Sequence, residues 1–456
     1  MSHRPTLVRL PSPGEPHAFK QTSYPALKDV CLNDPRLPPS PPYTPLKGTF
    51  QLPVLTPSDI TPETIPVVAV IGTGYVGTHL IEVFASQYKT LGFDISDKRL
   101  NEIHEQFAIN NKVELTSEAS RLAYATHYLI SVPTLLLPDK SIDLSYLRGA
   151  LATVSEHARP GATIVVESSV AVGMTRELLG PIALRNNCFV GMSPERVDPG
   201  RTCPAAHQIP KVVSGLDDVV PGSLAQIVRL YERVFDCVVP VSKPEVAEMT
   251  KLYKNCQRMM CIAYANEMAN ACEAHDIDPY EVCDAAATKP FGYMPYSPGP
   301  GVGGHCIPVN PYYLLSNNDF PILQAATEAM WQRPLEHARK CLADMRDANP
   351  ETLDPSHLSR VLVVGVGFKP GQSTLSNSPG LALIRGLVDA GDMEINFADS
   401  MVSQEMVPWV PKLDEQAWTR GGLEEYDMII VTMRQVGHDF SLLHSLQHPL
   451  VKFLCR

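Results

Sequence analysis

The spacing of hydrophobic residues changes near residue 66. From there on, short apolar runs that end in glycine, serine or proline alternate with stretches in which apolar residues recur every three or four positions. The runs suited to buried strands are 67–71, 126–133, 162–168 and 188–194. Strands that alternate with helices in this way predict a doubly wound parallel sheet.

Residues 244–275 hold no internal proline or glycine and are rich in alanine and methionine, which predicts one long helix. A second strand that runs into a G-x-G turn follows at 360–369, with a helical pattern at 378–391 and strands at 394–400 and 426–434. This distant repeat predicts an α/β fold, in which a central helical domain with one long helix joins two Rossmann-like doubly wound parallel-sheet domains.

Composition limits the classes of partner. The formal net charge of -11 argues against nucleic acid or an anionic membrane surface as a partner. No apolar run approaches the roughly 20 residues that span a bilayer. The 11 cysteines include no C-x-x-C pair, and no secretory signal is visible, so we expect a cytoplasmic protein without a disulfide framework or metal site. Residues 1–66 hold 15 of the 42 prolines, which predicts a disordered extension.

Gly72, Gly74 and Gly77 form a G-x-G-x-x-G turn between the first strand and its helix. Such glycines allow a tight turn, close approach of the backbone to a pyrophosphate, and close packing of the helix. Asp94 ends the next strand, where an acid binds the ribose 2′-hydroxyl. That carboxylate favours NAD over NADP, although Lys98 and the neighbouring arginine weaken the preference.

Three further segments carry side chains suited to chemistry. They are "ISVPT" (130–134) at a strand end, "MSPERVDPG" (192–200), and the long helix, where Lys251 and Asn255 stand four apart and share a face. In "GVGGHCIPVN" (301–310), three glycines precede Cys306. The absence of side chains there predicts a cleared approach to a nucleophilic thiol.

The order of these motifs resembles that of the UDP-glucose/GDP-mannose dehydrogenase family of NAD-dependent nucleotide-sugar 6-dehydrogenases. The resemblance runs from about residue 66 to 447. It rests on "VIGTGYVG", "ISVPT", "VESSVAVGMT", "SPERVDPG", "EMTKLYKNCQR", "PGPGVGGHCIP" and "VGVGFK". It implies that two NAD molecules oxidise a sugar 6-hydroxyl to a carboxylate, through a thiohemiacetal and then a thioester on a cysteine, which matches Cys306.

The resemblance also implies roles for individual residues. Lys251 and Asn255 would stabilise developing oxyanions, Glu195 would act as base in thioester hydrolysis, and Thr134 would position a water. The residues matched to cofactor binding are Gly72, Gly74, Tyr75, Val76, Gly77, Asp94, Lys98, Pro133, Thr134 and Ser169. Those matched to substrate binding are Tyr296, Gly303, Phe368 and Lys369. Arg258 matches an arginine of structural role.

The same resemblance divides the chain. It leaves the disordered proline-rich extension (1–65) outside, and it implies an NAD-binding Rossmann domain (66–240), a central helical domain (241–350) that carries the dimer contact and the catalytic lysine and cysteine, and a C-terminal Rossmann-like domain that binds the nucleotide sugar (351–456). A homodimer through the long helix is expected, with a nucleotide sugar as substrate.

Three positions depart from the family pattern. Asn310 stands where the family commonly has an aspartate, so water activation would rest on Glu195 or Thr134. Pro199 replaces a glutamate of the UDP-glucose branch and favours a UDP-N-acetylhexosamine. Gly371, Thr374 and Ser376 replace two acids and an arginine. Asn310 and Ser376 leave open a divergent member that binds NAD and nucleotide sugar with weak or incomplete activity. A two-electron dehydrogenase of the hydroxy-acid type would not explain Cys306.

Overall fold

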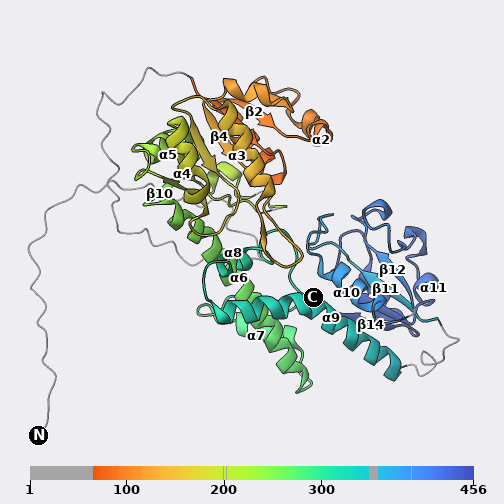
Figure 1. Ribbon diagram of the computed structural model, residues 1–456. Coiled ribbons are helices and arrows are strands. Elements are labelled where there is room, and N and C mark those ends of the chain that lie inside the picture. The colour runs from red at the N-terminus through yellow and green to blue at the C-terminus, as the bar shows by residue number, and fades with distance from the viewer. Residues whose placement is uncertain (1–64, 199, 202, 349–357, 392) are drawn as a thin grey trace, which may run out of the picture. The chain divides into compact units, whose positions relative to one another are not determined.

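A computed structural model of the protein describes residues 65–198, 200–201, 203–348, 358–391 and 393–456 (Figure 1). The predicted extension at 1–65 therefore lies outside the described residues, except for Ile65.

The first sheet has eight strands in the order β10-β9-β8-β7-β4-β1-β2-β3. Their bounds are β1 Val67–Ile71, β2 Lys89–Phe93, β3 Val113–Thr116, β4 His127–Ile130, β7 Thr163–Val166, β8 Phe189–Met192, β9 Lys211–Gly215 and β10 Val238–Val241. The six strands from β3 to β8 are parallel and have the order typical of dinucleotide-binding sheets. The sequence did not predict that β9 pairs antiparallel to β8. The chain reaches β9 through a loop and a short 3-10 turn, without the crossover helix that a parallel pairing needs.

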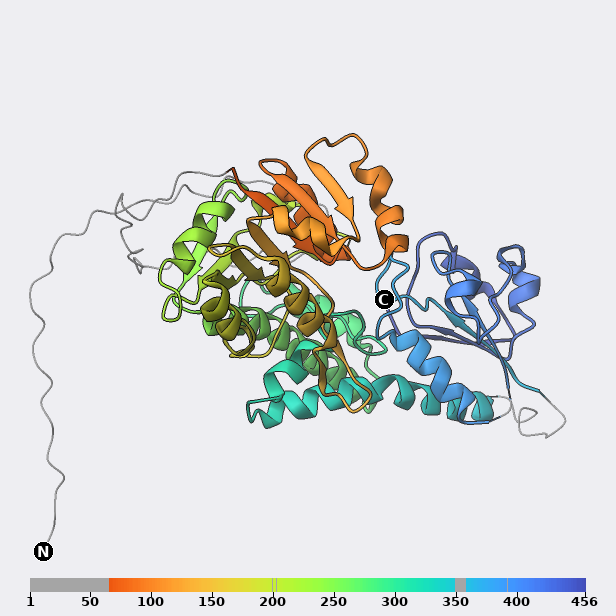
Figure 2. The ribbon, with the colours of Figure 1, turned by 45° about the horizontal axis from the view of Figure 1, so that its top comes forward.

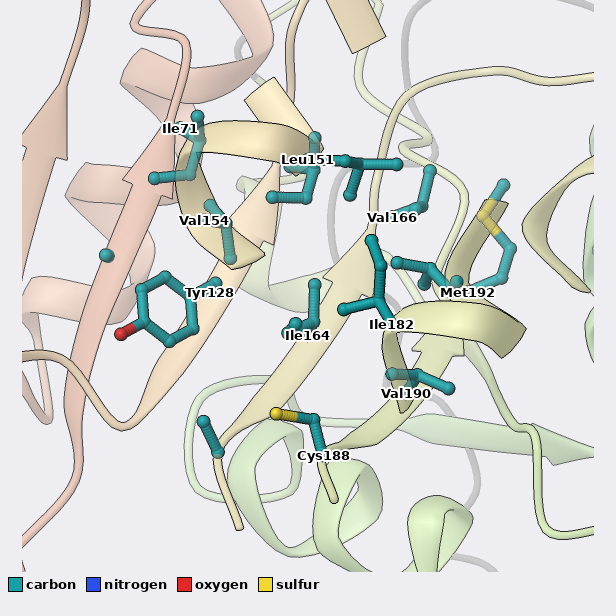
Figure 3. Packing of buried hydrophobic residues seen from close by; sticks show 14 of the residues in the cluster. Ile71, Tyr128, Leu151, Val154, Ile164, Val166, Ile182, Cys188, Val190 and Met192 are labelled. Atoms are coloured by element: carbon teal, nitrogen blue, oxygen red, sulfur yellow. The ribbon is translucent and has the colours of Figure 1, made fainter. Parts of the chain in front are cut away.

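Helices cover both faces of this sheet, as a doubly wound fold requires. They are α1 Tyr75–Ala85, α2 Asp97–Phe107, α3 Ser145–His157, α4 Met174–Asn186 and α5 Ser223–Tyr231. Figure 3 shows the core on the α3 and α4 side, where Leu151, Val154 and Ile182 pack over Tyr128 and Ile164. A second core on the other face receives side chains from α1, α2 and α5.

The central part is helical. Its long helix, α6 Pro244–Glu273, agrees with the predicted range to within two residues at its end. It is followed by α7 Pro279–Ala287, α8 Asn310–Leu315 and α9 Pro321–Ala348. The sequence did not predict α9, a 28-residue helix with Pro334 in its interior, where proline usually ends a helix. A small hairpin, β5 Leu135–Leu136 and β6 Ile142–Asp143, precedes α3.

The second sheet has the order β12-β11-β13-β14, and its pairings are all parallel. Its strands are β11 Arg360–Val364, β12 Glu394–Ala398, β13 Met428–Val431 and β14 Leu450–Phe453, with helices α10 Pro379–Val388 and α11 Arg420–Leu423. Helices α9 and α10 lie side by side in Figures 1 and 2. Both contribute buried side chains to one core with β11.

The two sheets begin with the same local structure. Gly72 and Gly365 have φ of 88° and 81° after β1 and β11. Each donates its N–H at 2.8 Å to the last carbonyl of the neighbouring strand. Asp94 and Asp399 follow those strands and accept hydrogen bonds from backbone N–H groups of the respective turns. This repetition confirms the predicted fold class of two Rossmann-like domains joined by helices.

Candidate active site

The glycine turn after β1 brings α1 close to the strand and leaves the backbone at the start of the helix uncovered. A Cβ at Gly77 would stand 1.9 Å from the carbonyl oxygen of Gly72, so only glycine lets α1 pack directly over the turn. A Cβ at Gly74 would meet nothing within 4 Å. The backbone at the start of α1 is therefore open to an anion.

Asp94 lies beside this turn at the end of β2. Its Oδ2 accepts hydrogen bonds from the N–H and the hydroxyl of Thr73 at 2.8 and 3.0 Å. The carboxylate is thus held where the sequence predicts the ribose of NAD. Of the two nearby cations, Lys98 is exposed, whereas the Nε of Arg99 donates to the Thr73 carbonyl at 2.9 Å. Arg99 therefore braces the turn.

The other predicted cofactor residues lie at the carboxyl edge of the same sheet. Those that open α1 or follow β4 and β7 are Tyr75, Val76, Pro133, Thr134 and Ser169. The Thr134 hydroxyl donates to the Ser169 carbonyl at 2.9 Å and joins two strand ends. The Tyr75 hydroxyl donates to the Asp198 carbonyl at 3.1 Å, in the loop after β8. Ligands of open α/β sheets bind at this edge.

Glu195 follows β8 and is 8% exposed. Its Oε1 accepts hydrogen bonds from the N–H groups of Arg196 and Val197 at 2.6 and 2.7 Å, and its Oε2 accepts one from Lys211 Nζ at 2.8 Å. Burial acts to raise the pKa of Glu195, but the Lys211 ammonium and the hydrogen bonds outweigh it, and the pKa falls to about 2. A carboxylate with so low a pKa is a weak base, which argues against the predicted role in thioester hydrolysis.

Lys211 joins Glu195 to a second buried carboxylate, Glu167. Lys211 Nζ donates to Glu167 Oε2 at 2.6 Å, and the Tyr231 hydroxyl donates to the other oxygen. Burial raises the pKa of Glu167 to about 7, although Lys211 opposes this. The sequence reasoning missed Lys211 and Glu167. Both could have been found as charged residues inside or directly after an apolar strand. A charged residue is rarely buried unless it is paired, so these two positions predict a buried ion pair.

Two residues of α6 contact loops of the candidate site, one after β8 and one that carries the predicted nucleophile. Lys251 and Asn255 are 8% and 3% exposed. Lys251 Nζ donates to the backbone carbonyl of Glu195, and the Asn255 amide donates to Asn310 Oδ1. The N–H of Asn310 donates to the Cys306 carbonyl at 2.9 Å. The family commonly has an aspartate at position 310, and its carboxylate could accept the hydrogen bond from Asn255. The Oδ1 of Asn310 accepts that hydrogen bond here.

Lys254 adds a cation near the thiol that was not predicted. Partial desolvation lowers the pKa of Lys254 although part of the residue stays exposed, the cations Lys251 and Arg196 lower this pKa further, and Cys306 acts in the opposite direction. Lys254 and Arg258, one turn later, both remain exposed at the surface of α6. The stretch of α6 that carries Lys251 therefore carries two further cations.

The glycines before Cys306 are explained by packing. A Cβ at Gly303 would stand 2.7 Å from the Cβ of Phe368, and one at Gly304 would stand 3.0 Å from the Phe368 ring. Gly304 also has a φ of 92°. These contacts and this φ require glycine at 303 and 304, and the cleared approach to the sulfur stays a prediction. Cys306 itself is half-buried.

Two residues of the C-terminal domain contact this region and the loop after β8. Ser376 Oγ lies 3.1 Å from His305 Nε2, and its carbonyl accepts a hydrogen bond from Gly304 N–H at 2.8 Å. Lys369 Nζ lies 3.4 Å from Asp198 Oδ2. Ser376, at the position where the family has an arginine, thus contacts the loop that carries Cys306.

The remaining predicted substrate residue, Tyr296, is half-buried in the loop before the glycines. Its carbonyl accepts a hydrogen bond from the Cys283 thiol at 3.8 Å. Within the same loop, Gly299 donates its N–H to Asn266 Oδ1 of α6 and accepts from Arg333 Nε of α9, both at 2.9 Å. Two long helices therefore fix this loop.

In the described part of the chain, no helix is long and apolar enough to cross a membrane. The same residues include no group of three or more His, Cys, Asp or Glu side chains arranged to hold a metal ion.

A glycine turn of the dinucleotide-binding type, an acid at the end of β2 and a cysteine loop braced by α6 together indicate a dehydrogenase with a dinucleotide cofactor. The model of the UDP-glucose/GDP-mannose dehydrogenase family, NAD binding domain, matches residues 67–235, and that of the family's central domain matches residues 245–329. The chain belongs to this family, and its first domain binds NAD. The predicted resemblance and cofactor are thereby confirmed.

Individual relatives agree with this assignment. The UDP-N-acetyl-D-mannosamine dehydrogenase of Pyrococcus horikoshii is 31% identical over 70% of this chain and 79% of that protein. The UDP-N-acetyl-D-glucosamine 6-dehydrogenase of Salmonella typhi is 35% identical, but the match spans 54% of this chain and 61% of that protein. A solved structure of the UDP-D-ManNAc dehydrogenase from Pyrococcus horikoshii has a TM-score of 0.75, 25% identity, and covers 86% of this chain and 95% of its own.

Proposed function

We propose that the protein oxidises the 6-hydroxyl of a UDP-sugar to a carboxylate in two NAD-dependent steps, with Cys306 as the covalent nucleophile. The observation that carries this proposal is the hydrogen-bonded chain Asn255–Asn310–Cys306, which joins α6 to the thiol loop. It supports a preorganised site, because Lys251 stands one turn from Asn255 on the same buried face.

Bound NAD supplies the acceptor for the hydride removed in each oxidation. Cys306 adds to the aldehyde after the first oxidation and carries the thioester after the second. Lys251 Nζ and the Asn255 amide stabilise the oxygen of C6. Glu195 keeps its negative charge beside Lys251 and positions it through its backbone carbonyl.

The substrate we favour is a UDP-N-acetylhexosamine. The motifs "SPERVDPG" and "GGHCIP" support this, as do the substrates named for the two relatives above. UDP-glucose is the alternative. The contact of Asn310 with Asn255 supports an active enzyme over a divergent binding protein, because the amide retains a hydrogen bond at the site.

We also propose a homodimer through α6. Three of its apolar side chains, Tyr253, Tyr264 and Met268, are 71%, 64% and 42% exposed. Their spacing of eleven and four residues places them on one helix face, which a second copy could cover. The cytoplasmic location stays a prediction.

The test is NAD reduction with UDP-glucose, UDP-N-acetylglucosamine, UDP-N-acetylmannosamine and GDP-mannose. One of the two UDP-N-acetylhexosamines should give the highest kcat/KM. Cys306→Ala should bind NAD and that sugar nucleotide but form no carboxylate. Binding without NADH formation by the unmodified protein would favour the divergent member.

A further inference from the structure

The hairpin of β5 and β6 extends from the end of β4 toward the loop that carries Cys306. At its start, the Thr134 hydroxyl donates at 2.9 Å to a backbone carbonyl that follows β7, which anchors the hairpin to the first sheet. Leu136 and Ile142 are partners across the hairpin, and both pack against the apolar cluster that includes Val309. The hairpin therefore links the carboxyl edge of the first sheet to the segment that follows the cysteine.

The tip of the hairpin lies against an indole ring of the central part. Lys140 Nζ stands 3.2 Å from the centre of the Trp331 ring, on α9, within the range of a cation–π interaction. The Nε1 of Trp331 donates to the Pro308 carbonyl at 3.4 Å, two residues after the cysteine. The ring of Tyr312, on α8, packs edge-on against the same indole. Trp331 therefore joins the hairpin tip to the chain on the C-terminal side of the cysteine.

The backbone at the tip gives a second reason to look for a role of Lys140. Its φ is 68°, in the left-handed region that glycine and asparagine occupy more readily than lysine. Backbone N–H groups of Lys140 and Leu137 close the turn onto the carbonyls of Leu137 and Ser141, both at 2.9 Å. These hydrogen bonds hold the turn without the lysine side chain. A residue kept in such a conformation points to a use of its side chain, and here that side chain contacts Trp331.

We propose that the hairpin, held by Lys140 on Trp331, fixes the distance between the end of β4 and Cys306, and that Lys140 and Trp331 are positioning residues for the second oxidation. This rests on the function proposed above. Pro133 and Thr134, which are predicted to bind the cofactor, lie at one end of the hairpin. The carbonyl of Pro308 lies at the other end of the chain of contacts.

The second oxidation should depend on this distance more than the first. In the first, the sugar is held by non-covalent contacts and can shift toward the hydride acceptor. In the second, C6 is already bonded to the sulfur of Cys306, so the loop sets its position. C6 then gives up a hydride to NAD and its hydroxyl loses a proton, while the C6–S bond stays intact. Reacting atoms must approach to about 3–3.5 Å, and a displacement of about 1 Å costs roughly 100-fold in rate.

The test is Lys140→Met with excess NAD, a limiting amount of the UDP-sugar that the unmodified protein oxidises fastest, and semicarbazide to trap free aldehyde. The unmodified protein should form two NADH per sugar. In Lys140→Met the second oxidation should slow by about tenfold or more, so that NADH per sugar falls toward one and the trapped 6-aldehyde accumulates. Lys140→Arg keeps a cation over the indole and should restore two NADH per sugar.

A second measurement needs no ligand. Hydrogen exchange of residues 307–316 should be faster in Lys140→Met than in the unmodified protein, because the tip no longer holds the segment. Lys140→Asn removes the ammonium but suits the left-handed turn, so it should show the same faster exchange and the same loss of NADH. It also replaces Lys140→Met if that variant fails to fold.

Arg385→Met is the matched control. It removes a cation over another indole, because the guanidinium of Arg385 lies 5.6 Å from the centre of the Trp409 ring in the C-terminal domain. This variant should leave both the exchange of 307–316 and the NADH ratio unchanged.

Three results would overturn the proposal: two NADH per sugar without trapped aldehyde in both Lys140→Met and Lys140→Asn, equal slowing of the two oxidations, or a normal Lys140→Asn beside a defective Lys140→Met. The last would assign the effect to the turn and not to the ammonium. Failure of the proposed function is distinguishable, because the unmodified protein would then form no NADH with any sugar nucleotide. In that case unchanged exchange in both variants would still overturn the role of Lys140 in holding the loop.

Discussion

The buried cluster of Lys211, Glu167 and Glu195 gives the sharpest stability prediction. Lys211 is 2% exposed, and its Nζ contacts Glu167 and Glu195 at 2.6 and 2.8 Å. Lys211→Met keeps an unbranched apolar stem but removes the ammonium that both carboxylates contact. Removing one partner of a buried ion pair costs about 3–5 kcal/mol, because it leaves buried charge uncompensated.

The loss should also depend on pH. Without Lys211, burial and mutual repulsion favour the neutral form of both Glu167 and Glu195, so their folded-state pKa values should lie above the unfolded ones. A carboxyl group with a raised pKa contributes stability below its unfolded pKa and loses that contribution as the pH rises through the folded value. Lys211→Met should therefore be less destabilised at pH 5 than at pH 8.

The assay is urea denaturation followed by circular dichroism at both pH values, with hydrogen exchange of 163–166 and 211–215 to locate the effect. Lys89→Met is the matched control. Lys89 Nζ lies 3.9 Å from Glu114 and its side chain is 61% exposed, so its loss should cost less than about 1 kcal/mol. A cost for Lys211→Met no larger than that control, or equal at both pH values, would refute the reasoning.

Three further predictions follow from named contacts. Gly303→Ala should lose about 1–3 kcal/mol in urea denaturation, because the new Cβ meets the Cβ of Phe368. Combined with Phe368→Gly, which removes that Cβ, it should cost less than the sum of the two single losses; additive losses would contradict this. Tyr264→Glu should shift the protein from dimer to monomer in sedimentation velocity, and an unchanged dimer would exclude this face of α6. In the unmodified protein the raised pKa of Glu167 should lower the free energy of unfolding by about 3 kcal/mol between about pH 4.5 and 7. Glu167→Gln should remove this fall; if the unfolding free energies of the two proteins changed in parallel with pH, the raised pKa would be contradicted.

Much of the site could be predicted because its determinants are local. The glycine turn with Asp94 needs a strand, a turn and a helix in succession, and these leave a pattern within about thirty residues. Lys251 and Asn255 share a helix face by their spacing alone. Cys306 was recognised by the motif around it.

The parts that sequence reasoning missed depend on tertiary contacts. Lys211 reads as an ordinary strand residue until the sheet places it between Glu167 and Glu195, which are 44 and 16 residues away in the chain. The low pKa that this contact gives Glu195 changes its expected role. Nothing in the sequence near Gly303 reveals that Phe368, 65 residues later, packs against it.

The number of NADH molecules formed per sugar nucleotide consumed tests the central claim most directly. A limiting amount of the preferred UDP-sugar, with excess NAD, should give two NADH and one uronic acid per sugar. One NADH per sugar, with an aldehyde as the product, would contradict the account, and so would an unchanged ratio of two with Cys306→Ala.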